Sequence, residues 1–178
     1  MENTKYKQLL KNLESKDKAE VITSIDMLRK EGNESAIPFL VNTLVNNPDE
    51  GVKNAVSALL FDLKEEKALP ALIIGIIDPA NKEYQQLLVS ACWESGLNCR
   101  PYLKFFAELA IISDYFVAIE CLTVIENMVG PFDEKELEAA ITMVKEGADN
   151  DEEKFDLLNS IWEVLVDFKA IDEEMPEN

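Results

Sequence analysis

The fold is decided by residues 37–63, which read IPFLVNTLVNNPDEGVKNAVSALLFDL. From Val52 onward, apolar side chains recur at the three- and four-residue intervals that place them on one face of an α-helix. Pro38 is typical of the first turn of a preceding helix, because a residue without an N–H leaves no hydrogen bond unmade there. The Asn-Asn-Pro-Asp sequence of residues 46–49 separates the two patterns. The stretch therefore predicts two helices joined by a short turn.

The same two-helix unit recurs along the chain. A proline followed two residues later by leucine occurs at Pro38, Pro70 and Pro101, at spacings of 32 and 31 residues. A second series of apolar helical patterns, spaced by 31, 32 and 31 residues, begins at Val21, Val52, Tyr84 and Tyr115. Two series with one period predict a helical hairpin that is repeated along the chain.

The repeat divides the sequence into ten helices in five hairpins, with no strand. Short segments with Gly, Asn, Asp or Ser separate the helices, and these residues favour helix ends and starts. The expected pairs are 5–14 with 17–31, 35–46 with 49–64, 68–77 with 82–95, 100–112 with 115–129, and 133–146 with 151–168. Because no linker is long enough to divide the chain, we expect one domain of residues 1–171 and an acidic C-terminal tail of residues 172–178.

The repeated unit resembles the HEAT-repeat family of armadillo-like helical proteins. In the second hairpin, residues 37–40 match the family's Pro-x-Leu start, Asp49 lies in the turn, and residues 52–55 match its Val-Arg-x-x-Ala opening. The third and fourth hairpins have Tyr84-Gln85 and Tyr115-Phe116 where the Val-Arg pair would stand. The resemblance implies an all-α, right-handed superhelix (solenoid) of about five hairpins. The short units also resemble bacterial HEAT-like variants related to phycobilin lyases, but the matched motifs are structural and imply no lyase activity.

Composition excludes several classes of function. The 178 residues include 17 Lys and Arg, 35 Asp and Glu and no His, for a formal charge of -18. This charge argues against binding nucleic acid or an anionic membrane, because both require cations that neutralise phosphate. The absence of His removes the commonest general base, and no phosphate-binding Gly-rich loop or Gly-x-Ser-x-Gly motif occurs. We therefore predict a non-enzymatic, soluble, cytoplasmic protein without a cofactor.

Metal and thiol chemistry is also not indicated. Three cysteines without a histidine are too few for a structural zinc site, so Cys92, Cys99 and Cys121 are expected to be buried, reduced thiols. Cys99 precedes Arg100, whose positive charge could favour the nucleophilic thiolate, but no general base lies near it in sequence. Residues 149–153 (Asp-Asn-Asp-Glu-Glu) lack the later Gly and Glu of a calcium-binding EF-hand loop, and we expect them to cap the last helix.

The acidic residues are concentrated toward the C-terminus. Residues 111–178 contain nineteen acidic and four basic side chains, a charge of -15, whereas residues 1–110 contribute only -3. One interpretation is a solvated cap and tail. The other is a surface that attracts a basic partner, because a patch of one sign accelerates encounter with the opposite sign.

The resemblance also suggests which residues meet a partner. In HEAT-like stacks the second helices line the concave surface, and superposing those of hairpins two to four gives equivalent positions beside the core. The candidate partner-binding residues are Lys53, Phe61, Gln85, Trp93, Phe116 and Glu120. The aromatic members are either anchors for a partner or packing between neighbouring hairpins. Trp162, on the apolar stripe of the last helix, is expected in the core.

These observations favour a scaffold or adaptor that binds a net-basic protein or peptide through its concave face and acidic C-terminal region. The alternative is a small acidic inhibitor or immunity protein that neutralises a basic toxin or nuclease. Both use the charge of the chain, but only the scaffold explains the repeated hairpins.

Overall fold

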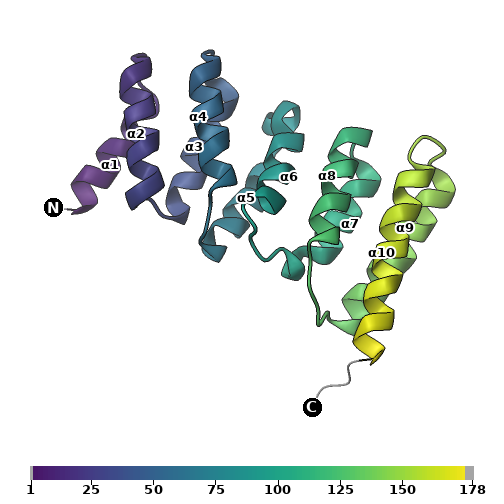
Figure 1. Cartoon of the computed structure of the whole chain (residues 1–178). Helices are drawn as coiled ribbons and strands as arrows, with labels where there is room; N and C mark the ends of the chain where they lie inside the picture. The colour runs from purple at the N-terminus through teal and green to yellow at the C-terminus, as the bar shows by residue number, and fades with distance from the viewer. Residues whose placement is uncertain (1, 175–178) are drawn as a thin grey trace. The chain divides into compact units, whose positions relative to one another are not determined.

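The structure, a computed structural model, describes residues 2–174, and its regular secondary structure over that range is helical, with no strand (Figure 1). The ten α-helices are α1 (Glu2–Asn12), α2 (Lys18–Glu31), α3 (Ile37–Asn46), α4 (Glu50–Phe61), α5 (Leu69–Ile77), α6 (Gln85–Glu94), α7 (Leu103–Ile112), α8 (Tyr115–Glu126), α9 (Glu134–Asn150) and α10 (Phe155–Glu174). Short 3₁₀ helices are η1 (Glu34–Ala36), η2 (Glu66–Ala68), η3 (Pro79–Tyr84) and η4 (Arg100–Tyr102). The all-α prediction is confirmed.

The helices fall into two compact units, unit 1 (Met1–Leu97) and unit 2 (Asn98–Asn178). In unit 1, α1 pairs with α2, α3 with α4 and α5 with α6, and neighbouring hairpins pack through α2 with α4, α4 with α6 and α3 with α5. In unit 2, α7 pairs with α8 and α9 with α10, and the hairpins pack through α7 with α9 and α8 with α10. Within each unit, first helices therefore pack on first helices and second helices on second helices (Figure 1).

The prolines open first helices, as predicted, in two of the three hairpins. Pro38 and Pro70 lie in the first turns of α3 and α5. Pro101 instead lies in η4, the single 3₁₀ turn that precedes α7.

Among the described residues, no helix is both long enough and apolar enough to cross a membrane.

Aspartate side chains cap the helices that follow the turns. The carboxylate of Asp49 accepts a hydrogen bond from the Val52 N–H at 3.1 Å at the start of α4. Asp17, Asp78, Asp114 and Asp133 do the same for α2, η3, α8 and α9. An aspartate at this position satisfies a backbone donor that has no partner within the helix and places negative charge against the positive end of the helix dipole.

The core is built from the apolar faces that the repeat predicts. Val52, Val56 and Leu60 are fully buried on α4. The three cysteines are buried, as predicted. Trp162 is only half-buried, and the Lys145 ammonium lies 5.1 Å from the centroid of its indole ring. The prediction that Trp162 lies in the core is therefore only partly right.

The last hairpin is longer than predicted. The expected end of its first helix at residue 146 is wrong, because α9 continues through Gly147 to Asn150. Gly147 does not stop the helix; it allows close packing, since a Cβ at this position would lie 2.9 Å from Cγ1 of Ile111 on α7. α10 also runs to Glu174, into the segment predicted as a tail, and the remainder of that segment, residues 175–178, lies outside the described residues.

A buried lysine joins the two hairpins of unit 2. Lys154 is 6% exposed, and its ammonium donates hydrogen bonds to the carbonyls of Ala110 (3.1 Å), Ile111 and Ser113 (2.8 Å). These carbonyls lie at the C-terminal end of α7, where a helix has acceptors without partners and carries partial negative charge. The Asp151 carboxylate lies 3.4 Å from the same ammonium and accepts a hydrogen bond from the Lys154 N–H. The expected cap at residues 149–153 is thus supplied by Asp151.

We expect Lys154→Met to lower the free energy of unfolding by about 2–4 kcal/mol, because it leaves three buried carbonyls without a donor. Urea unfolding followed by circular dichroism measures this change. Lys135→Met, at an exposed position on α9, serves as the control and should change stability by less than about 0.5 kcal/mol. Equal stability of the two variants would contradict a structural role for the Lys154 ammonium.

Acid pH should destabilise the fold partly through Asp49 and Asp151. The Lys18 ammonium, 2.8 Å from Asp49, holds the pKa of that carboxyl below its ordinary value, and the Val52 N–H adds to the effect. The Lys154 N–H, followed by the charge of the Lys154 ammonium, lowers the pKa of Asp151. Both carboxyls thus bind protons less readily in the folded chain than in the unfolded one. Their contribution is complete above the unfolded pKa of about 3.9 and is lost as the pH falls through the lower folded values.

The melting temperature of the double variant Asp49→Asn with Asp151→Asn should therefore fall less than that of the wild type when the pH is lowered from about 5 to about 2. Asparagine can still accept the capping hydrogen bonds, so the change isolates the titration. Asp26→Asn with Asp156→Asn removes the same formal charge at exposed positions and should retain the wild-type slope. Identical slopes for all three proteins would be evidence against this assignment.

Candidate partner-binding surface

The six predicted partner-binding residues lie in both units. Lys53, Phe61, Gln85 and Trp93 belong to unit 1, on α4 and α6, whereas Phe116 and Glu120 belong to unit 2, on α8. A single surface made of all six stays a prediction. Phe61, Trp93 and Glu120 are half-buried, and Phe116 is 66% exposed.

The Lys53 ammonium already has partners within unit 1. It lies 3.1 Å from the Glu50 carboxylate and 5.4 Å from the centroid of the Tyr84 ring. The Tyr84 side chain, followed by the Glu50 carboxylate, raises the pKa of Lys53 above its ordinary value. Lys53 therefore stays charged, and it links α4 to the segment that precedes α6.

Gln85 is buried and completes the end of α5. Its amide NH₂ donates to the Ile76 carbonyl at 2.9 Å, and its amide oxygen accepts from the Lys82 ammonium. Asn81, also buried, donates to the neighbouring Gly75 carbonyl at 2.9 Å. Two carbonyls at the C-terminal end of α5 are thus satisfied by side chains from η3 and α6. Gln85 acts inside the fold, a role that alignment of the hairpins could not reveal.

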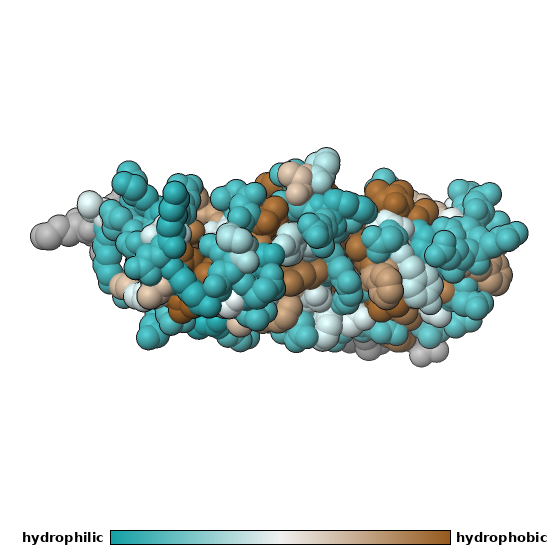
Figure 2. Space-filling model, turned by 90° about the horizontal axis from the view of Figure 1, so that it is seen from above, coloured by the Kyte–Doolittle hydropathy of each residue, from teal (hydrophilic) through white to brown (hydrophobic). Residues whose placement is uncertain are grey.

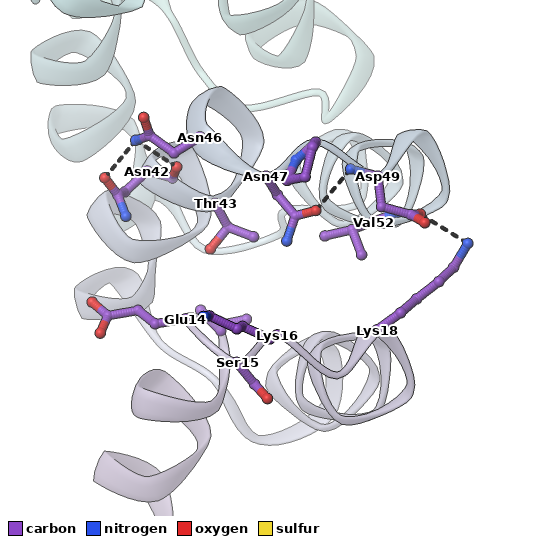
Figure 3. Close-up of a pocket in the computed structure, with 12 residues that line it drawn as sticks. Glu14, Ser15, Lys16, Lys18, Asn42, Thr43, Asn46, Asn47, Asp49 and Val52 are labelled. Carbon is purple, nitrogen blue, oxygen red and sulfur yellow. Dashed lines mark hydrogen bonds and ion pairs between the residues drawn. The ribbon is translucent and has the colours of Figure 1, made fainter.

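An open pocket of about 480 Å³ lies between the first two hairpins of unit 1 (Figure 3). Asn42, Thr43 and Asn47 form one side, and the turn with Ser15 and Lys16 forms the other. Its polar groups are largely engaged with the fold. The Asn46 amide donates to the side chain and backbone of Asn42, the Asn47 side chain accepts from the Asp49 N–H, and Lys18 pairs with Asp49.

Unit 2 exposes a group of apolar side chains that the sequence reasoning only partly found. The α8 apolar cluster consists of Ile112, Tyr115, Phe116 and Ile119, which are 73%, 41%, 66% and 37% exposed. The cluster lies where α7 ends and α8 begins. In Figure 2, which views the turn end of the hairpins, brown hydrophobic surface interrupts the teal over this part of unit 2. Exposed apolar side chains gathered in this way are characteristic of an interaction surface.

A signal for this cluster was present in the sequence. The first two turns of α8 read YFVAIEC and are apolar on nearly every side, not on one stripe. Val117, Ala118 and Cys121 take the buried face, so Tyr115, Phe116 and Ile119 must face outward. A helix that is apolar all round needs a second covering surface, so the sequence indicates an exposed apolar face here, and the structure identifies its residues.

Carboxylates accompany the α8 apolar cluster, and the segment of the chain that forms it contributes no basic side chain. Asp114 precedes α8, and the Lys154 contacts with Ile111 and Ser113 bring the exposed carboxylates of Glu153 and Asp156 to the same end of unit 2. Residues 105–134 contain no Lys or Arg, and Lys154 itself is buried. The surface therefore combines apolar contacts with negative charge.

The described residues bear on metal binding and nucleophilic chemistry in two ways. They contain no cluster of three or more Cys, Asp or Glu arranged to hold a metal ion. Burial raises the pKa of the Cys121 thiol, which disfavours the reactive thiolate. Every buried side-chain nitrogen or oxygen among the described residues has a hydrogen-bond partner.

Comparisons with protein-family models and with curated proteins found no match to this chain.

Replacing Gln85 tests whether its role is structural. Gln85→Leu removes the donor to the Ile76 carbonyl at the buried end of α5, and we expect a loss of about 1–3 kcal/mol in the free energy of unfolding. Asn54→Ala, at an exposed amide on α4, should be nearly neutral. Chemical denaturation of both variants supplies the measurement, and a Gln85→Leu protein of wild-type stability would restore Gln85 to the list of surface candidates.

Proposed function

We propose that this chain is a non-enzymatic protein-interaction module, a scaffold or adaptor, that binds a net-basic protein or peptide. The observation that carries the proposal is the α8 apolar cluster on a strongly acidic unit. Residues 98–178 contain six Lys and Arg and twenty Asp and Glu, a net charge of -14. Apolar contacts supply binding energy, and the surrounding charge selects and attracts a partner of opposite sign.

Three of the six bases of unit 2 are already engaged by groups of the unit itself. Lys145 lies 3.8 Å from Asp149, Lys154 is buried against carbonyls, and Lys169 lies 2.7 Å from Glu138. Glu146, Glu152 and Glu153 are exposed. These carboxylates are available to steer a basic partner toward unit 2, and the effect should weaken with salt because exposed charges are screened.

We further propose that the two units belong to one right-handed, HEAT-like superhelix. Three features support it: the period of 31 or 32 residues runs across both units, both are built from hairpins whose like helices pack together, and aspartates cap the second helices in both. Such a stack offers an extended surface, and about 800 Å² per partner is typical of a specific complex.

Charge reversal in unit 2 tests the proposed function. The triple variant Glu146→Lys, Glu152→Lys and Glu153→Lys should slow association with partners captured from an extract of the source cells by roughly tenfold at low salt. It should also flatten the dependence of the association rate on salt between about 50 and 200 mM. Biolayer interferometry with the immobilised full chain measures both quantities.

The matched control reverses three exposed acids of unit 1, Glu65, Glu83 and Glu94, and changes the net charge by the same amount. This control should associate more nearly like the wild type, because its reversed charges lie in the unit without the α8 apolar cluster. Captured partners that are predominantly acidic, or association rates unchanged by the unit 2 variant, would overturn the proposal.

A further inference from the structure

We propose that the α8 apolar cluster is the docking site for a basic amphipathic helix. This inference rests on the proposed function and specifies both the surface and the form of the partner. It is carried by four observations: the exposure of the cluster, its fixed geometry, the carboxylates around it, and the all-helical character of the described chain.

The cluster presents a ridged apolar surface. The rings of Tyr115 and Phe116 meet edge to face, with centroids 6.4 Å apart and an angle of 89° between their planes. Ile119 follows one helical turn later on α8, and Ile112 precedes the rings at the end of α7. Two aromatic rings at right angles, flanked by branched aliphatic side chains, form the type of anchor that dominates binding energy at protein interfaces.

The backbone beneath the cluster is held in place. The Asp114 carboxylate accepts from the Val117 N–H at 3.1 Å, which fixes the start of α8. Lys154 binds the carbonyls on both sides of Ile112, those of Ile111 and Ser113. Val117 and Ala118 are buried under the same turn. A partner therefore meets a surface that is already ordered, which lowers the entropic cost of binding.

The charges determine the sign of the partner. Asp114, Glu153 and Asp156 are exposed at this end of unit 2, and no exposed lysine or arginine accompanies them in residues 105–134. A partner with Lys or Arg beside its apolar residues meets attraction, whereas an acidic segment meets repulsion. The same charge disfavours an anionic membrane as the occupant.

The form of the partner follows from the geometry of the surface. Residues 2–174 contain no strand, so this part of the chain offers no open sheet edge to which an extended peptide could add. Tyr115, Phe116 and Ile119 instead lie on one exposed face of the first two turns of α8, and Ile112 precedes them at the end of α7. An amphipathic helix matches them with apolar residues at i, i+3, i+4 and i+7 and directs its basic face toward the carboxylates.

Three fluorescein-labelled peptides of about 18 residues test the inference with the full chain. The first is a Leu/Lys amphipathic helix, the second has the same composition with Leu scattered around the helix, and the third is a Leu/Glu amphipathic helix. We expect fluorescence anisotropy to show at least tenfold tighter binding of the first peptide than of either other peptide. Phe116→Ser with Ile119→Ser should weaken the first peptide about tenfold or more and leave the second unchanged.

The control variant is Ile74→Ser with Ile77→Ser, which removes two isoleucines that are 65% and 57% exposed on α5 of unit 1. It should bind the first peptide like the wild type. All substituted positions are exposed, and thermal melting verifies that each variant is folded.

The outcomes separate this inference from the proposed function. Equal binding of the two Lys peptides, lost on reversing Glu146, Glu152 and Glu153 but not in the Phe116 and Ile119 variant, would overturn the docking site and leave the proposed function standing. Comparable binding of the Leu/Glu peptide would overturn the basic character of the partner. Binding that is lost equally in the unit 1 control would also overturn the docking site, as would failure of all three peptides to bind.

Discussion

The organisation of unit 2 depends on the hydrogen bonds that the buried Lys154 ammonium donates to the end of α7. The ammonium replaces its hydration shell with the carbonyls of Ala110, Ile111 and Ser113 and the nearby Asp151 carboxylate. A charged group as deeply buried as this one is tolerated only when it is fully hydrogen-bonded. The contacts join the start of α10 to the end of α7, and they order the turn on which Ile112, Tyr115 and Phe116 stand. The buried polar contacts of Lys154 thus hold in place the segment that carries the exposed α8 apolar cluster.

Unit 1 solves the corresponding problem with neutral groups. The carbonyls at the end of α5 receive the side-chain amides of Asn81 and Gln85 from the following segment of the same hairpin. An amide is cheaper to bury than an ammonium, but it cannot reach across to another hairpin. The longer lysine side chain makes the connection between hairpins in unit 2. The two units therefore share a hairpin plan, and α5 and α7 differ in the groups that close their C-terminal ends.

The helices could be predicted from sequence because their signals are local. The prolines, aspartate caps and apolar spacing each act within a few residues of the helix they define, and tertiary contacts did not override them. The length of α9 could not be predicted, because Gly147 takes a helical conformation in order to pack on Ile111. The candidate site was harder still. Alignment of the hairpins drew candidates from α4, α6 and α8. It could not show that Lys53 and Gln85 have partners in neighbouring segments, whereas Phe116 is exposed.

The buried thiols make it possible to measure local unfolding of this protein by their rate of chemical modification. Cys92 lies in the core of α6 in unit 1, and Cys121 lies in the core of α8 in unit 2. Alkylating reagents attack the thiolate, and burial both shields Cys121 from the reagent and keeps its proton in place. Each thiol becomes reactive only when the helices around it separate, so the rate at which it is modified follows the local opening of its own unit. The modification rates of Cys92 and Cys121 therefore report the local stability of unit 1 and of unit 2 separately, without an engineered label.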